Sequence, residues 1–141
     1  MGAEEARFDS RVRESFGRQG FMRTLGATLE EVGEGSVVIR LSHGDALAQQ
    51  HGYLHAGALI AVVDSACGYA ALTVAPPGHE VLTSELKVNL LRPASGGVVA
   101  RGRVVRAGRT LTVCQGDAYD AGDPSRHLAT MLATVVAVPR A

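Results

Sequence analysis

Hydrophobic and polar residues follow two kinds of pattern along this chain of 141 residues, one typical of helices and one typical of strands. Near its start, Phe8, Val12 and Phe16 recur four residues apart, which predicts a one-sided helix over 4–18 that lies on another element. From 55 to 75 nearly every residue is apolar, and a Pro-Pro pair closes the run. A helix that is apolar on all sides belongs inside a soluble fold, so we expect this segment to be the central helix.

Short segments in which apolar and polar residues alternate account for most of the other residues. Runs on either side of the turn 33–35 predict a hairpin between 25 and 41. Four more strands are expected after the helix, and their ranges are 82–90, 96–107, 109–120 and 126–138. In the first of these, the pattern places the even-numbered residues on one face and the odd-numbered ones, including Thr83, on the other. The turns are so short that neighbouring strands must pair antiparallel.

One central helix, a hairpin before it and four strands after it can bury their apolar surfaces together if the sheet curls around the helix. This is the hotdog arrangement, of class α+β. We interpret residues 1–141 as a single domain in which 1–20 form an N-terminal helical segment. The exposed edges of one curled sheet predict pairing with a second subunit.

Composition narrows the classes of partner. Fourteen basic and fourteen acidic side chains cancel, so no nucleic-acid-binding face is expected. The N-terminal residues are charged, and no run approaches the roughly 18 to 20 apolar residues of a membrane span, which predicts a cytoplasmic protein with no membrane partner. Cys67 and Cys114 lie in apolar surroundings without a Cys-x-x-Cys spacing, which is typical of buried thiols and not of catalysts.

Asp64 is the most informative residue of the apolar helix, because nothing near it in the sequence would neutralise its charge. A buried, unpaired carboxylate is costly, so we expect Asp64 either to carry chemistry or to cap or bridge to a neighbouring subunit. The preceding loop, 43–54, is rich in Gly, Gln and His, a composition that suits a functional loop. His51 and His55 are four residues apart, yet no third ligand falls at usable spacing, so no metal site is predicted.

The pattern Gln-x5-His-Ala-Gly-x6-Asp from Gln49 to Asp64 resembles the PaaI-like branch of the hotdog acyl-CoA thioesterases. Two later motifs strengthen the resemblance, Leu-Arg-Pro-Ala at 91–94 and Arg-Ala-Gly-Arg-Thr at 106–110. The similarity extends from about residue 16 to residue 138. It implies an enzyme that hydrolyses an acyl-CoA to a free acid and coenzyme A. Coenzyme A is then part of the substrate, and no separate cofactor is expected.

The resemblance also implies roles for single residues. Gln49 stands where the family has a loop amide, and His55 is the motif histidine, which the residues themselves favour as a structural group. Ala56, the residue after it, would donate its backbone N–H to the thioester carbonyl. Asp64 matches the carboxylate that acts as nucleophile or general base, and Thr83 matches a strand hydroxyl found in some members.

Coenzyme A lies near a strand turn in the family, which makes Arg106, Arg109 and Thr110 the expected phosphate contacts. An alternative interpretation of the two arginines is a solvated turn with no ligand. The sequence leaves both open.

Physical chemistry supports these roles independently. N–H groups at a helix N-terminus, here Ala56 and Gly57, aim donors and partial positive charge at an oxygen that becomes more negative during attack. Asp64 follows Ala56 by eight residues, or about 12 Å along one helix, too far to serve the same carbonyl. We therefore expect a homodimer or homotetramer whose sites combine two chains at the subunit interface.

Three departures from the family pattern leave the acyl group open between aromatic, short-chain and medium-chain. Ala56 replaces the commonest glycine, Gln49 replaces the asparagine of many members, and Gly68 stands where one related type has threonine. An alternative function is a non-catalytic acyl-CoA-binding or regulatory protein, which would keep the pocket and the arginines but would not require Asp64. A hotdog dehydratase would show a different arrangement of His and acid.

Overall fold

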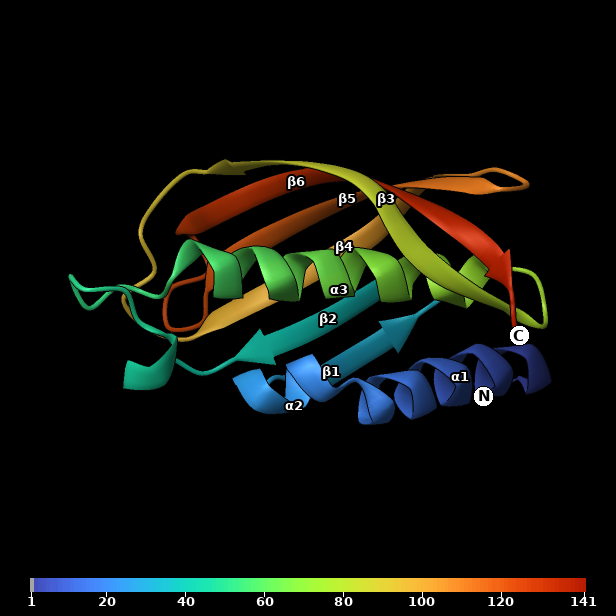
Figure 1. Cartoon of the computed structure of the whole chain (residues 1–141), viewed down its shortest axis with the longest axis horizontal. Coiled ribbons are helices and arrows are strands. Elements are labelled where there is room, and N and C mark those ends of the chain that lie inside the picture. The colour runs from blue at the N-terminus through green and yellow to red at the C-terminus, as the bar shows by residue number, and fades with distance from the viewer. Residues whose placement is uncertain (1) are drawn as a thin grey trace.

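The computed structural model describes residues 2–141 as a six-stranded sheet curled around a long helix (Figure 1). The helices are α1 (Ala3–Arg18), α2 (Gly20–Leu25) and α3 (Ala56–Val74), with a single 3-10 turn at Asp45–Leu47. The strands are β1 (Thr28–Gly33), β2 (Ser36–Leu41), β3 (His79–Leu90), β4 (Val98–Ala107), β5 (Leu111–Asp120) and β6 (His127–Pro139). The predicted α+β hotdog fold is confirmed.

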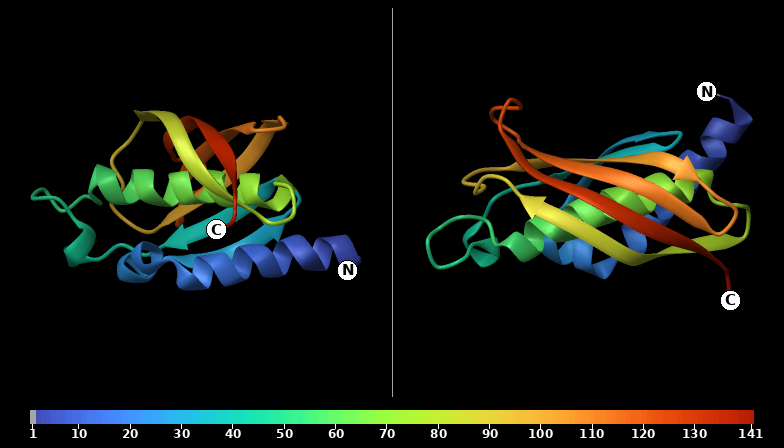
Figure 2. Two further views of the ribbon diagram at one scale, coloured as in Figure 1. Left: turned by 45° about the vertical axis from the view of Figure 1, so that its right-hand side comes forward. Right: turned by 90° about the horizontal axis from the view of Figure 1, so that it is seen from above.

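All pairings in the sheet are antiparallel, and the strand order is β1-β2-β4-β5-β6-β3. The hairpin that precedes α3 therefore occupies one end of the sheet, and β3 forms the opposite edge (Figure 2). Each predicted strand after the central helix is present, with ends shifted by up to three residues. The six-residue helix α2 was not predicted, because it is too short to show a helical period.

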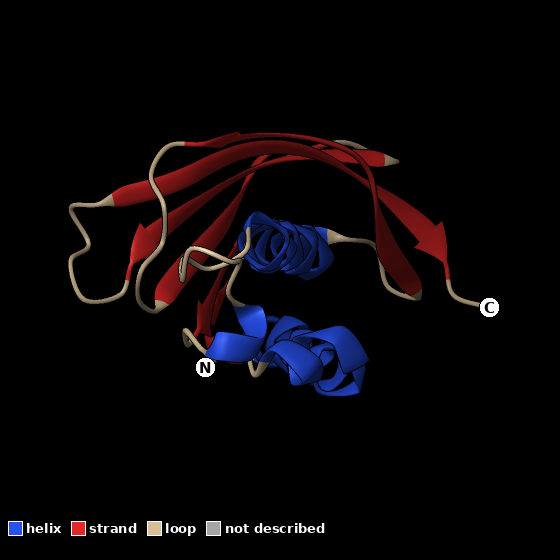
Figure 3. Ribbon diagram, turned by 60° about the vertical axis from the view of Figure 1, so that its left-hand side comes forward, coloured by secondary structure: helices blue, strands red, loops and turns tan. Residues whose placement is uncertain are grey.

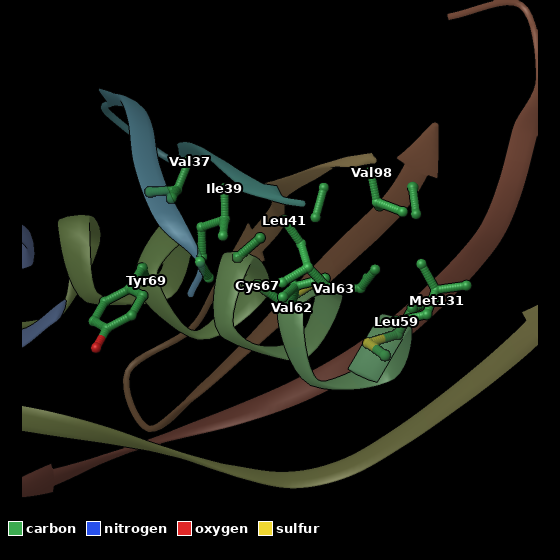
Figure 4. Packing of buried hydrophobic residues seen from close by; sticks show 14 of the residues in the cluster. Val37, Ile39, Leu41, Leu59, Val62, Val63, Cys67, Tyr69, Val98 and Met131 are labelled. Carbon is green, nitrogen blue, oxygen red and sulfur yellow. The ribbon is translucent and has the colours of Figure 1, made fainter. Parts of the chain in front are cut away.

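Two glycines allow α3 to pack closely against the sheet. Gly102 on β4 lies opposite Gly116 on β5, and both face α3. A Cβ atom at Gly102 would collide with the backbone of Ala66, and one at Gly116 would lie 2.5 Å from the Val63 side chain. Only glycine allows the helix backbone to come so close, which fixes where along the sheet α3 rests. The apolar side chains around this contact form the core (Figure 4).

On its other side α3 is covered by α1, so the long helix lies between the curled sheet and the N-terminal helix (Figure 3). The predicted period of α1 is visible in this contact, because Phe8 and Val12 are buried. The Phe16 ring lies 5.9 Å from the ring of Tyr69 on α3. Residues at the end of α1 are thereby brought next to the middle of α3.

Two expectations about α3 need correction. By length and composition its 19 residues could cross a membrane, contrary to the expectation that no run approaches such a span, although most of the helix is buried inside this fold. It is also not covered on all sides. One stripe of the helix is only half-buried, because β3 and the end of α1 cover it in part; its members include Ile60, Ala61, Asp64, Ser65 and Gly68.

A β-bulge in β3 changes which residues face the helix. Thr83 pairs with Val135 but Glu85 pairs with Thr134, so Ser84 is an extra residue in β3. The bulge shifts the alternation by one, which puts Thr83 on the same face as Leu86. The predicted alternation over 82–90 was therefore wrong for the residues that precede the bulge. Leu82 was expected on the same face of the strand as Leu86, but its side chain points away from the helix and is 62% exposed.

Candidate active site

The start of α3 presents one free backbone donor. His55 is the N-cap residue, and its Nδ1 accepts a hydrogen bond of 2.7 Å from the Gly57 N–H. The N–H groups of Ala58 and Leu59 donate to the carbonyl oxygen of His55. Within residues 2–141 no atom accepts a hydrogen bond from the Ala56 N–H. This arrangement gives His55 a capping role and revises the expectation for Gly57, whose N–H is already engaged.

A tight loop places Gln49 beside this helix start. The Gln49 N–H donates to the Tyr53 carbonyl over 2.8 Å, and Gly52, with a φ of 87°, allows the chain to turn back. The Gln49 side-chain oxygen accepts from the His51 N–H, which leaves its amide NH2 group as the free end. Gln49 and Ala56 line one hollow of about 380 Å³, which we call the helix-start hollow.

The Leu-Arg-Pro-Ala motif also lines the helix-start hollow. The Leu54 N–H donates to the Ala94 carbonyl over 2.8 Å, which ties the loop to this segment. All four residues of 91–94 line the hollow, together with Leu90 at the end of β3. Two motifs that are about 40 residues apart in the sequence thus form one structural unit.

Asp64 lies in a second hollow of about 400 Å³, the Asp64 hollow, between α3, β3 and the end of α1. The side chain is half-buried, and its Oδ1 accepts a hydrogen bond of 2.7 Å from Thr83 Oγ1. The bulge in β3 turns Thr83 towards Asp64 and so gives the carboxylate a neutral partner from a distant segment. The other carboxylate oxygen, Oδ2, has no donor within residues 2–141 and can accept a proton or attack a carbonyl group.

The two hollows share no residue, so one chain does not bring Ala56 and Asp64 to a single substrate carbonyl. They lie on the same helix with a rise of about 12 Å between them. A helix cannot bend enough to shorten this span. The separation expected from the sequence is present in the structure.

Arg106, Arg109 and Thr110 are exposed at the β4–β5 hairpin. This hairpin lies towards the C-terminal end of α3, at the opposite end of the molecule from the helix-start hollow (Figure 1). Within one chain the structure therefore does not bring the expected phosphate contacts together with Ala56.

Neither cysteine is suited to catalysis. Burial raises the pKa of the Cys114 thiol to about 11 and raises the pKa of the Cys67 thiol further. Both groups therefore remain protonated near neutral pH and are poor nucleophiles. Within residues 2–141, no three His, Cys, Asp or Glu side chains gather closely enough to hold a metal ion.

Several polar residues near Asp64 could not be predicted from the sequence. Ser15 and Gln19 from the α1 region, with Ser65 and Tyr69 on α3, line the Asp64 hollow. Nothing in the sequence linked the two segments, since about 50 residues separate them. His127 shares a 2.7 Å hydrogen bond with Asp117 through Nε2, on the side of the sheet away from α3.

Comparison with known proteins decides the family. A sequence profile described as the thioesterase superfamily matches residues 51–126, more than half of the chain. The chain belongs to the thioesterase superfamily. An inferred esterase of Halobacterium salinarum is 31% identical over 101 residues, which cover 68% of this thioesterase superfamily member and 67% of the relative.

Solved structures agree with this assignment. The structure of a thioesterase family protein from Silicibacter pomeroyi matches with a TM-score of 0.89 and 44% identity, covering 94% of this chain and 98% of that one. The Escherichia coli PaaI protein from the phenylacetic acid degradation operon matches with a TM-score of 0.88 over 98% of both chains. At 16% identity this second likeness shows the fold alone. The structure of a phenylacetic acid degradation-related thioesterase from Ralstonia eutropha is 26% identical, with a TM-score of 0.79 over 92% of this chain and 98% of that one, and with the family profile it confirms the resemblance to PaaI-like hotdog thioesterases.

Proposed function

We propose that this thioesterase superfamily member hydrolyses the thioester bond of an acyl-CoA with an aromatic, short-chain or medium-chain acyl group. The observation that carries the proposal is the pair of complementary groups on α3: a backbone donor without an acceptor at Ala56, and a carboxylate with one free oxygen at Asp64. Hydrolysis of a thioester needs both groups: a donor that binds the carbonyl oxygen, and either a base that activates water or a nucleophile that attacks the carbonyl carbon.

The reaction balances with Asp64 in either role. As a general base, Asp64 takes a proton from water as the water oxygen attacks the carbonyl carbon; the C–S bond then breaks, and the proton passes from Asp64 to the leaving thiolate. As a nucleophile, Asp64 forms an acyl anhydride with loss of the coenzyme A thiolate, and water then hydrolyses the anhydride. Both routes consume one water and yield the free acid and coenzyme A. In both, negative charge builds up on the carbonyl oxygen during the attack, and the Ala56 N–H stabilises that charge.

We further propose that the site forms between two chains of a homodimer or homotetramer. The distance between Ala56 and Asp64 along α3 requires the helix start of one chain to meet the Asp64 hollow of the other. The edge strand β3 supports pairing, because Leu82 and Leu90 on it are 62% and 51% exposed. A long edge with exposed apolar residues is a ready surface for a second copy.

The proposal is tested by incubating the purified protein with a panel of acyl-CoAs and following thiol release with a thiol reagent. Cys67 and Cys114 are buried, so the folded protein itself contributes little signal. We expect at least one acyl-CoA to yield equal amounts of acid and coenzyme A. Tight binding of acyl-CoAs with no turnover across the panel would contradict hydrolysis and would support the non-catalytic binding function.

The exposed arginines of the β4–β5 hairpin lead to a separate prediction. Arg109→Ala should raise KM for acyl-CoA by about tenfold with kcat nearly unchanged, because a lost phosphate contact weakens ground state and transition state equally. Arg106→Ala should act in the same direction. Steady-state kinetics measure both, and Arg13→Ala, which removes an exposed arginine from α1, is the matched control.

A truncated thioester without the nucleotide distinguishes phosphate binding from a general defect. The Arg109 and Arg106 variants should hydrolyse it as the unaltered protein does. If their KM for the full acyl-CoA is also unaltered, the hairpin is a solvated turn and the nucleotide binds elsewhere.

A further inference from the structure

The side chain that caps α3 is a histidine, although Ser, Thr, Asp and Asn are the usual residues at this position. His55 Nδ1 accepts a hydrogen bond of 2.7 Å from the Gly57 N–H. A ring nitrogen that accepts a hydrogen bond carries no proton, so the imidazole in this arrangement is neutral and its proton is on Nε2. The cap therefore fixes both the tautomer and the charge of His55.

Gly57 lets the ring lie over the start of the helix. A Cβ atom at this position would lie 3.0 Å from Nδ1 and 3.3 Å from Cε1 of the His55 ring, closer than side chains usually pack. In the same turn the Ala58 N–H donates to the His55 carbonyl oxygen over 3.0 Å, and within residues 2–141 the Ala56 N–H has no acceptor. The bond between Gly57 and the ring thus holds the turn that presents the Ala56 N–H.

This cap is lost when the ring gains one proton. The His55 side chain is exposed, so water can deliver a proton to Nδ1. Protonation turns the acceptor into a donor, and two N–H groups then face each other. The added positive charge also lies at the N-terminus of a 19-residue helix, where the helix dipole disfavours a cation. The Gly57 N–H loses its acceptor, and the first turn is no longer held in one geometry.

The groups around His55 do not hold a charged ring in the capping position. The ionisable side chains on the segments next to the helix start are His43, Asp45, His51, Tyr53 and Arg92. Within residues 2–141 none of them forms a hydrogen bond or an ion pair with the His55 ring, whose one bond is to Gly57. In the proposed two-chain site, the second chain adds its Asp64 carboxylate, which would attract a protonated ring away from the cap.

We propose that His55 is a positioning residue that works only while it is neutral: when it gains a proton in acid, the cap opens and the site loses activity. This inference rests on the proposed acyl-CoA hydrolysis and adds its regulation by pH. Neutral His55 holds the Gly57 N–H and so orients the neighbouring Ala56 N–H towards the thioester carbonyl oxygen. A displaced donor stabilises the transition state less, so an open cap should lower kcat by about tenfold or more.

The pH dependence of kcat tests this role with a cap that does not titrate. Asn accepts the Gly57 hydrogen bond whether the solution is neutral or acidic, whereas Ala cannot accept it at all. Near neutral pH, His55→Ala should lower kcat by about tenfold, and His55→Asn should restore it to within about threefold of the unaltered protein. From about pH 8 to about pH 5, where histidines titrate, kcat of the unaltered protein should fall reversibly by at least about tenfold, and kcat of His55→Asn by less than about threefold.

Amide hydrogen exchange measures the cap separately from activity. The protection of the Gly57 N–H, corrected for the intrinsic effect of pH on exchange, should fall by at least about tenfold in acid in the unaltered protein and should stay constant in His55→Asn. His79→Asn is the matched control. His79 lies at the start of β3, where its Nδ1 contacts the Pro77 carbonyl oxygen, so this variant should lose activity and Gly57 protection in acid as the unaltered protein does.

The possible failures are distinguishable. If kcat of the unaltered protein does not fall in acid, or if the fall persists in His55→Asn, the positioning role is overturned and the proposed hydrolysis stands. Equal protection of the Gly57 N–H at both pH values overturns it as well. If no acyl-CoA is hydrolysed at any pH, the proposed function fails and the positioning role fails with it, while the exchange data alone still show whether the cap opens.

Discussion

Asp64→Asn is expected to lower kcat for acyl-CoA hydrolysis by about 10² or more, because the amide can neither take a proton from water nor attack the carbonyl carbon. The fold should tolerate the change. The side chain is half-buried, and the amide oxygen of Asn can accept the Thr83 hydrogen bond that Asp64 Oδ1 now accepts. Single-turnover and steady-state rates measure the loss, and a binding assay should show that affinity for acyl-CoA is largely retained.

Asp9→Asn is the matched control for this substitution. Asp9 pairs with Arg13 on the outer side of α1, away from both hollows, so the same chemical change there should leave kcat unaltered. A folded Asp64→Asn protein that turns over at nearly the normal rate would show that Asp64 only holds Thr83 or a neighbouring subunit, the alternative interpretation of this carboxylate.

Ala56→Pro should be almost as damaging, by about 10² to 10³ in kcat, because proline removes the one backbone N–H that α3 leaves free. Proline is well tolerated at the first position of a helix, where its missing N–H breaks no helical hydrogen bond. The preceding residue, His55, already has the extended ψ of 137° that a following proline requires. The change thus deletes the donor and preserves the helix.

Ala56→Gly is the control, since it alters the side chain and keeps the N–H. It should retain most of the activity. Thermal melting of the three proteins would show that Ala56→Pro remains folded. Equal kcat values for the Pro and Gly variants would rule out Ala56 as the carbonyl donor and would return that role to another group, such as the Gln49 amide.

The architecture could be predicted because its signals are local. The apolar run of α3, the alternation of the later strands and the short turns each fix one element, and only a curled sheet buries them all. The motif spacing also anticipated the separation of Ala56 from Asp64, since eight residues of helix have a fixed length.

What could not be predicted depends on contacts between distant segments. The bulge at Ser84 has no marked sequence signal, yet it turns Thr83 towards Asp64 and reverses the expected faces of the first part of β3. The capping of α3 by the His55 ring, which engages the Gly57 N–H, depends on a side-chain rotamer. The Gln19–Tyr69 contact joins segments 50 residues apart and was equally hidden.

A mixing experiment tests most directly whether each site combines two chains. Asp64→Asn and Ala56→Pro proteins, each inactive alone, are mixed under conditions that allow subunits to exchange, and hybrid formation is verified with two affinity tags. Each hybrid dimer would have one site with both defects and one with neither, so an equal mixture should recover about a quarter of the unaltered activity. Verified hybrids that remain inactive would contradict the account and would place the whole site within one chain.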